Sequence, residues 1–251
     1  MRLNLFPQPG ASDVLCELTD AFALAACANG HVVTRGLSSD GVNIVFGCHA
    51  GFLRDPSFVL PMRAFNVLYN VEQAPLSGYE RFDVVFNLFY YVHDQVRSCS
   101  IYCPLGYSAV FEGEATPGIE DETIEVLHLG PLREDLKGEF GRKYGHLVTA
   151  PSAFGAARDV LIRSAKINIV VQTSAHYHFP ELRWLLLACK RKLVLCNIHA
   201  SYGKLDPHTH LTIWDDFAAD ARRWLDAGRP ARQEVADRVY EDLRRNVRYD
   251  N

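Results

Sequence analysis

No apolar run in the sequence is long enough to cross a membrane. Apolar stretches such as Trp184 to Ala188 and Leu193 to Cys196 are interrupted by Lys190-Arg191-Lys192, and none in the chain reaches the roughly 20 residues that a membrane-spanning helix requires. The opening residues, Met1 to Pro7, lack the apolar core and the small-residue cleavage site of a signal peptide. These absences predict a cytoplasmic protein with no membrane span.

Disulfide-rich and metal-centred classes are also disfavoured. The 7 cysteines include no Cys-x-x-Cys pair, and most stand in apolar runs, where a thiol packs like a small hydrophobic side chain. The histidine pairs His176/His178 and His208/His210 have no nearby set of carboxylates or thiolates that would complete a metal shell. We therefore expect reduced, structural cysteines, no metal and no cofactor.

Several common catalytic signatures are missing. The sequence has no G-x-G-x-x-G, no G-x-x-x-x-G-K-[ST] and no G-x-S-x-G, so the dinucleotide-binding, P-loop and serine-hydrolase classes lack their phosphate cradle or nucleophile. The chain contains no repeat of fixed period and no low-complexity tract. Its formal net charge of -4 creates no overall positive field that would attract nucleic acid.

The sequence does contain a regular alternation of short apolar strands and helical segments. With 251 residues, 48% of them hydrophobic, it is long enough to bury two modest cores. Short runs rich in β-branched and aromatic residues predict two parallel sheets with helices between the strands. The predicted strands are residues 2–6, 31–34, 42–46, 66–69 and 84–86 in the first sheet and 100–103, 125–128, 146–148, 167–171 and 193–196 in the second.

We therefore predict an α/β fold with two Rossmann-like domains facing a cleft, the first of them trimmed. Residues 1–98 form the N-terminal domain and residues 99–228 the C-terminal domain. Residues 229–251 form an amphipathic helix that packs back on the body through apolar side chains at four-residue intervals, namely Val235, Val239, Leu243 and Val247.

Open α/β sheets bind ligands where strands end and helices begin, so the carboxyl edge of the second sheet is the expected site. Gly106 and Tyr107 follow one strand, and there the glycine would let a ligand approach the backbone while the tyrosine offers an aromatic face. The alternative for Tyr107 is a packed side chain in a tight turn. Gly130 and Arg133 follow another strand, and Arg133 would present a forked donor suited to a diphosphate.

Two more charged residues are candidates for this edge. Lys166 precedes a strand and either supplies positive charge near phosphates or is a solvated lysine. Glu181 follows Pro180 at a predicted helix start, where the helix dipole favours a carboxylate. It either accepts hydrogen bonds from the hydroxyls of a ribose or serves only to start the helix.

Two residues of the first half follow strands where a cleft would open. His49 would act as a general base on an acceptor hydroxyl because the pKa of histidine lies near working pH. Glu72 would do the same if it is partly desolvated. Buried, hydrogen-bonded structural roles are the alternative for both.

The ordered set of these segments resembles the bacterial and phage glycosyltransferases of the GT-B type that have a glycosyltransferase-family-1-like C-terminal domain. The similarity spans roughly residues 40 to 200. The matching segments are Y-N-x-E-Q at residues 69–73, P-x-G-Y at 104–107, a strand-Gly-Arg segment at 128–133, R-D-x-L-I-x-x-A-K-I at 158–167, and a segment like H-Y-x-x-x-x-F-E at 176–181.

This resemblance implies that the C-terminal domain binds a nucleotide-diphosphate sugar such as a UDP-sugar, without a metal, and that the N-terminal domain faces the acceptor. Positive side chains and helix amides would then stabilise the leaving diphosphate in place of a metal ion. The implied donor-binding residues are Gly106, Tyr107, Gly130, Arg133, Lys166, Tyr177 and Glu181, with His49 or Glu72 as the base.

The chain departs from the family pattern next to Glu181. Trp184 stands where the family usually carries an arginine, although Arg183 stands beside it. The second glutamate that the family tends to place after the last strand is missing near Cys196 and Asn197.

The sequence thus predicts a metal-independent hexosyl- or pentosyltransferase that acts on an acceptor hydroxyl. The acceptor is a polysaccharide, a protein, a metabolite or a base in phage DNA, and the residues do not separate these. A non-catalytic nucleotide-sugar-binding module or partner subunit with a degenerate site is the alternative. A phosphate-sugar epimerase or isomerase is a third interpretation.

Overall fold

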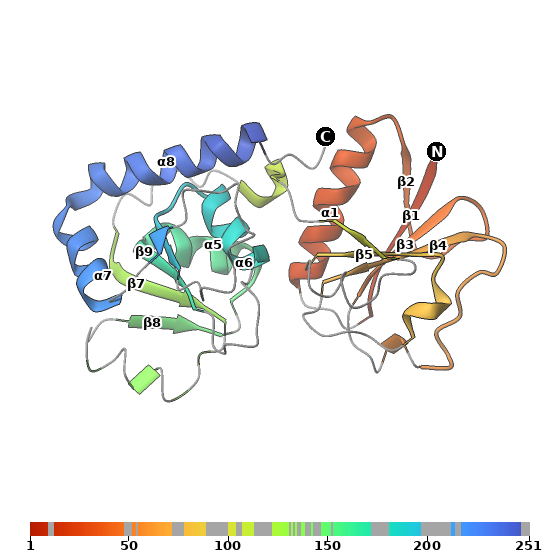
Figure 1. Cartoon of the computed structure of the whole chain (residues 1–251), viewed down its shortest axis with the longest axis horizontal. Coiled ribbons are helices and arrows are strands. Elements are labelled where there is room, and N and C mark those ends of the chain that lie inside the picture. The colour runs from red at the N-terminus through yellow and green to blue at the C-terminus, as the bar shows by residue number, and fades with distance from the viewer. Residues whose placement is uncertain are drawn as a thin grey trace. The chain divides into compact units, whose positions relative to one another are not determined.

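The structure is a computed structural model of the chain, which forms two compact units, one of Met1–Leu105 with Tyr249–Asn251 and one of Gly106–Arg248 (Figure 1). The described residues are 1–9, 13–47, 52–53, 55–71, 78–88, 100–103, 107–112, 122–130, 132, 134, 137–138, 142, 147–151, 153–171, 181–196, 212–213 and 217–246. Of these, only the backbone is described for residues 13–14, 181–182, 212–213, 217–218 and 246.

The first unit is built on a six-stranded parallel sheet with the order β2-β1-β3-β4-β5-β6. The helix α1 (Asp13–Ala28) connects β1 to β2 and packs against β1, β2 and β3. A short 3-10 helix, η1 (Tyr79–Arg81), precedes β5. The strands are β1 (Arg2–Pro7), β2 (Val32–Arg35), β3 (Val42–Gly47), β4 (Phe65–Asn70), β5 (Val84–Asn87) and β6 (Ser100–Tyr102).

The two faces of this sheet are covered differently. The register of the paired strands places Leu5, Ile44 and Val67 on one face of the sheet. On the same face, the ring of Phe22 in α1 meets the ring of Phe46 in β3 edge-on, with ring centroids 5.5 Å apart. We call this the α1 face. The opposite face, which we call the loop face, packs against the connections from β3 to β4 and from β4 to β5, through Leu53, Phe58, Leu60 and Phe82.

Buried asparagines tie the amino ends of these strands together on the loop face. Asn4 Nδ2 donates a hydrogen bond to Asn43 Oδ1 at 3.2 Å, and Asn43 Nδ2 donates to Asn66 Oδ1 at 2.9 Å. Asn66 Nδ2 donates in turn to the carbonyl oxygens of Pro61 and Ala64. A buried amide without a hydrogen-bond partner costs about 1–3 kcal/mol of stability, so these hydrogen bonds allow the sheet to bury asparagine side chains without that loss.

The second unit is built on a five-stranded parallel sheet with the order β11-β10-β9-β7-β8. Its strands are β7 (Ile124–Leu129), β8 (Leu147–Ala150), β9 (Ala165–Val170), β10 (Val194–Cys196) and β11 (Thr212–Ile213). Its helices are η2 (Ala109–Glu112, a 3-10 helix), α5 (Gly155–Ser164), α6 (Glu181–Cys189), α7 (Phe217–Asp226) and α8 (Gly228–Asn246).

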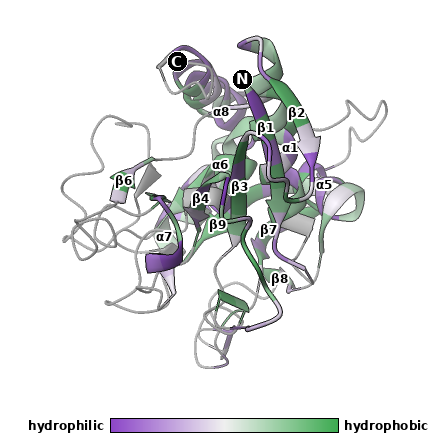
Figure 2. Cartoon of the chain, turned by 90° about the vertical axis from the view of Figure 1, so that its right-hand side faces the viewer, coloured by the Kyte–Doolittle hydropathy of each residue, from purple (hydrophilic) through white to green (hydrophobic). Residues whose placement is uncertain are grey.

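The core of the second unit is formed by alternate residues of the central strands. Ile167 and Ile169 of β9 pack with Val126 and Leu195, and α7 covers them with Ala221, Trp224 and Leu225. The helices α5 and α6 pack against β7, β9 and β10, so the central strand β9 is buried almost continuously, as expected for a parallel strand covered on both faces. Figure 2 shows apolar residues along strands such as β3, whereas α7 carries hydrophilic ones.

The predicted fold class is confirmed, but one strand belongs to a different sheet from the one expected. β6 pairs with β5, through Phe86 and Ile101, so it ends the first sheet and does not begin the second. The boundary between the units accordingly falls between Leu105 and Gly106, not between residues 98 and 99. The predicted C-terminal helix is present as α8 within the second unit, where it contacts α6 and α7.

Among the described residues, no helix is both long enough and apolar enough to span a membrane.

Candidate functional site

The strand order of the second unit reverses between β7 and β9. From β7 the chain proceeds to β8 on one side, whereas β9, β10 and β11 follow on the other side. Connections that diverge in this way leave a crevice at the carboxyl ends of the two central strands, and open α/β sheets bind their ligands there. Gly130 directly follows β7 at this point, and Val171 directly follows β9.

Gly130 and Arg183 lie in contact at the carboxyl end of β7, where the strand order reverses. Gly130 has a φ of +94°, in the left-handed region, and its N–H donates to the carbonyl oxygen of Ala150 at the end of β8 at 3.0 Å. Arg183, in the first turn of α6, lies so close that a Cβ built on Gly130 would be 2.7 Å from its Nη2 and 3.2 Å from its Cζ. Glycine satisfies both the backbone conformation and the close approach.

The guanidinium of Arg183 has no acidic partner within the described part of the chain. By contrast, Arg158, Lys190, Lys192 and Arg232 of the same unit each form an ion pair with a carboxylate. Burial lowers the pKa of Arg183 from its ordinary value, but arginine stays cationic in proteins. A partly buried cation is costly without a counter-charge, so this position favours an anionic ligand.

The amino end of α6 adds to this positive potential. The helix begins at Glu181, as the sequence predicted, and spans 9 residues. The N–H groups of its first turn have no partners within the helix, and the helix dipole places partial positive charge at the same end. Backbone N–H groups and a guanidinium together are the donors that phosphate oxygens prefer. The side chain of Glu181 lies outside the description.

Lys166 lies at the opposite edge of the sheet. It is the second residue of β9, at the amino end of that strand, whereas Gly130 follows the carboxyl end of the neighbouring β7. The length of β9 separates Lys166 from Val171, roughly 16 Å at about 3.3 Å per residue. The structure therefore does not bring Lys166 together with Gly130 and Arg183.

Tyr107 has a structural partner inside the second unit. Its hydroxyl donates a hydrogen bond to Glu112 Oε1, and the hydroxyl of Tyr240 donates to the same oxygen at 2.5 Å. The two tyrosine rings meet edge-on with centroids 6.0 Å apart. Burial, followed by the contacts with Glu112 and Tyr240, raises the pKa of Tyr107. These contacts favour the interpretation of Tyr107 as a packed side chain.

The other predicted site residues are not covered by the structure. They lie outside the described residues and are His49, Glu72, Gly106, Arg133 and Tyr177.

The sequence analysis did not assign Arg183 to the site. The family pattern directs attention to position 184, but Trp184 is only 6% exposed and belongs to the buried side of α6. Successive residues of a helix are rotated by about 100°, so the neighbouring position faces a different direction. The one signal available in the sequence was an arginine next to the expected position.

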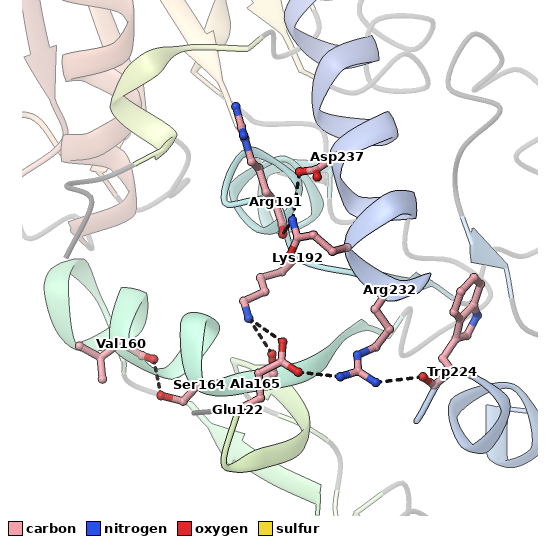
Figure 3. Close-up of polar contacts among 10 residues, drawn as sticks. Glu122, Val160, Ser164, Ala165, Arg191, Lys192, Trp224, Arg232 and Asp237 are labelled. Carbon is pink, nitrogen blue, oxygen red and sulfur yellow. Dashed lines mark hydrogen bonds and ion pairs between the residues drawn. The ribbon is translucent and has the colours of Figure 1, made fainter. Parts of the chain in front are cut away.

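The amino edge of this sheet carries paired charges. Glu122 accepts hydrogen bonds from Lys192 Nζ at 3.1 Å and from Arg232 Nη2 at 2.6 Å, as Figure 3 shows. Burial alone would raise the pKa of Glu122, but the two cations outweigh it and the pKa is lowered. Lys192 also donates to the carbonyl oxygen of Ala165, and Arg232 donates to that of Trp224. This cluster has the contacts of a structural tie between the sheet and α8.

Comparisons with known proteins identify the fold. No protein-family model matches the chain, and no curated protein matches its sequence. An alpha-glucosyltransferase, solved with UDP and a 13-mer DNA containing a HMU base, is similar with a TM-score of 0.61 and 10% identity, covering 99% of this chain and 96% of that one.

Two further solved structures are similar over most of the chain. AviGT4, a glycosyltransferase involved in avilamycin A biosynthesis, has a TM-score of 0.51 and 15% identity, and the match covers 98% of this chain and 97% of that one. An alpha1,3-fucosyltransferase solved with GDP has a TM-score of 0.51 and 10% identity, with coverage of 96% and 82%. The chain therefore has the Rossmann-like GT-B fold, while the narrower motif group remains a prediction.

Proposed function

We propose that the protein is a glycosyltransferase that moves a sugar from a nucleoside-diphosphate sugar to an acceptor hydroxyl without a metal ion. The observation that carries the proposal is the guanidinium of Arg183, which has no acidic partner among the described residues and lies against Gly130 at the point where the strand order reverses. The similar folds support it, because two of those structures were solved with UDP and with GDP.

The reaction requires stabilisation of negative charge at this crevice. The bond between the anomeric carbon and the diphosphate oxygen breaks, and its electron pair leaves with the nucleoside diphosphate. The acceptor oxygen forms the new bond to that carbon, and its proton passes to a base. Because negative charge grows on the leaving diphosphate, Arg183 and the first-turn N–H groups of α6 would bind the transition state more strongly than the substrate.

The remaining roles in this proposal follow the sequence analysis. Glu181 begins α6 at the same edge and is proposed as the ligand of the ribose hydroxyls. His49 or Glu72 is proposed as the base, and Arg133 as a second diphosphate ligand. Lys166 is not included in the donor site, because it lies at the amino end of β9.

The first test is calorimetric binding of UDP, GDP and dTDP and of their glucose conjugates, in EDTA and again in Mg²⁺. We expect one nucleoside diphosphate to bind equally well in both. Arg183→Ala should weaken that binding by roughly 10- to 100-fold, because a hydrogen bond to a charged group contributes about 1.5–3 kcal/mol. Arg222→Ala is the matched control, since the Arg222 side chain is 74% exposed on α7 and forms only an exposed pair with Asp226.

Each contrary result removes a definite part of the proposal. Unchanged affinity in Arg183→Ala would show that the donor site is elsewhere. A requirement for Mg²⁺ would remove the metal-independent mechanism. Donor binding without transfer to polysaccharide, protein, metabolite or modified-DNA acceptors, and without donor hydrolysis, would favour the non-catalytic module.

A further inference from the structure

An apolar groove of about 520 Å³ opens on the α1 face of the first unit. It lies at the amino ends of the strands, the edge opposite to the one where open α/β sheets bind their usual ligands. Its floor is formed by strand residues, and one wall is formed by α1. The floor includes Leu3, Ile44, Val67 and Phe86, and the wall includes Phe22 and Ala25.

The topology explains why this part of the sheet is open. Connections between parallel strands are right-handed, so connections running in opposite directions along a sheet lie on opposite faces. The connection from β1 to β2 runs one way, through α1, and the connections from β3 to β4 and from β4 to β5 run the other way. Phe58 and Phe82 show two such connections packed on the loop face. On the α1 face, Phe65 is 49% and Ile101 50% exposed.

The chemistry of the lining defines the kind of ligand that fits. Phe22, Phe65 and Phe86 contribute aromatic rings, and none of the described lining residues is a lysine, arginine, aspartate or glutamate. The polar lining side chains, Asn29 and His31, both belong to the turn between α1 and β2. The volume falls within the roughly 300–1,000 Å³ that small-molecule sites occupy.

We propose that this groove binds a neutral, flat and largely apolar small molecule, with its polar group directed toward Asn29 and His31. Asn29 Nδ2 already donates to the carbonyl oxygen of Ala25 at 3.0 Å, which leaves its amide oxygen as the acceptor for a ligand. Phenyl rings stack on flat apolar molecules, and the described lining side chains offer a charged ligand no counter-charge.

The small exposed area of the groove floor favours a small molecule over a protein partner. Leu3, Ile44 and Val67 are each only 4% exposed, so the floor offers little accessible surface to a second protein. A stable protein interface needs about 800 Å² of accessible surface on each partner. A groove of this volume suits a small molecule that fits among its lining side chains.

The test uses the full chain and the neutral aromatic probe N-phenyl-1-naphthylamine, whose fluorescence rises in apolar surroundings. We expect saturable binding of one probe per chain. Ala25→Trp should fill the groove and weaken binding at least tenfold. Leu24→Trp is the matched control, because Leu24 is the adjacent residue of α1 but is 56% exposed and does not line the groove.

A second variant keeps the test decisive if Ala25→Trp does not fold, as judged by circular dichroism. Phe65→Glu places a charge at the half-exposed rim and should also weaken probe binding at least tenfold. Absence of saturable binding, or unchanged binding in either folded variant, would overturn the proposal. So would a dimer in sedimentation velocity that Phe65→Glu dissociates, because the α1 face would then belong to a second copy. Nucleoside diphosphate binding should be unaffected by Leu24→Trp and Ala25→Trp alike.

Discussion

The guanidinium of Arg183 rests against the backbone of Gly130, where a Cβ would lie 2.7 Å from Nη2. The two residues come from different elements, the first turn of α6 and the end of β7, and they meet where the strand order reverses. Because the described residues provide no carboxylate for Arg183, this contact positions a cation without neutralising it. The proposed diphosphate site rests on this contact.

Gly130→Ala should damage both stability and donor binding. The left-handed φ of +94° should cost the alanine variant roughly 1–2 kcal/mol of unfolding free energy, and the methyl group would displace the guanidinium of Arg183. Urea unfolding and calorimetry measure the two effects. Gly138→Ala is the control, because a Cβ there meets no described residue within 4 Å. If Gly130→Ala weakens nucleotide binding in an Arg183→Ala background as much as in the wild type, the two residues act independently and the interpretation fails.

Asn168→Leu should stabilise the protein. Asn168 is 0% exposed on β9, and neither its Nδ2 nor its Oδ1 has a hydrogen-bond partner among the residues that the structure describes. Because an unpaired buried amide costs about 1–3 kcal/mol, an apolar side chain of similar size should raise the unfolding free energy by about 1 kcal/mol. Urea denaturation measures the change.

Asn43→Leu provides the contrasting variant for Asn168. Asn43 is also 0% exposed, but its amide both accepts from Asn4 and donates to Asn66. Its replacement should lower the unfolding free energy by about 1–3 kcal/mol, because the neighbouring amides lose their partners. A loss of stability in Asn168→Leu would instead reveal that an internal water or ligand satisfies Asn168.

Glu122→Gln should destabilise the second unit in a pH-dependent manner. The pKa of Glu122 is lowered from its ordinary value of 4.5, so folding favours the ionised form. Its contribution is therefore complete above about pH 4.5 and is lost as the pH falls through the lower pKa of the folded state. Removing one partner of a nearly buried ion cluster costs about 3–5 kcal/mol. We expect that deficit at pH 7 and a smaller one at pH 3, both measured by urea unfolding.

A glutamate on the surface of α8 provides the control, because it tests whether the loss of an exposed carboxylate lowers stability as much as the loss of Glu122. The Glu234 side chain is 78% exposed and lies 3.8 Å from Arg238, so Glu234→Gln should change the unfolding free energy by less than about 0.5 kcal/mol. A Glu122→Gln deficit that does not shrink between pH 7 and pH 3 would rule out the proposed ionisation.

Tyr240→Phe should remove one hydrogen bond and keep a cation–π contact. Its hydroxyl lies 2.5 Å from Glu112 Oε1, and the guanidinium of Arg191 lies 4.1 Å from its ring centroid. Loss of a hydrogen bond to a carboxylate should lower the unfolding free energy by about 1.5–3 kcal/mol. Tyr240→Leu should cost about 0.5–1 kcal/mol more, because the ring is lost as well. Equal thermal stability of the two variants would show that Arg191 contributes nothing.

Local pattern in the sequence predicted most of the secondary structure. The alternation of apolar runs with Gly, Pro and Asp located the strands from β1 to β5 and from β7 to β10 to within a few residues, and Pro180-Glu181 located the start of α6. These predictions succeeded because the burial of a parallel strand and the start of a helix depend mainly on residues close in the chain. The short β11 and the helix α7 had no such clear pattern and were not predicted.

The local sequence pattern could not predict which strands pair or which distant side chains come into contact. The strand at Ser100–Tyr102 looks the same in the sequence whether it ends the first sheet or begins the second, and its pairing with β5 decided this. Lys166 was expected near phosphates, yet its position at the amino end of β9 follows only from the direction of that strand in the sheet. Tyr107 was predicted either as a ligand or as a packed side chain, and the contacts with Glu112 and Tyr240 that favour the second alternative join residues far apart in the chain.

The sequence by itself determined that this protein is an α/β chain with two parallel sheets, because the pattern of apolar residues in each short segment indicates a buried strand or a helix. Only the tertiary structure decided that Gly130 and Arg183 form the candidate anion site. Their contact depends on the strand order, which places β7 beside β9, and on the rotation of α6, which buries Trp184 and turns Arg183 toward the crevice. Both are set by packing between segments far apart in the chain, and no local pattern records them.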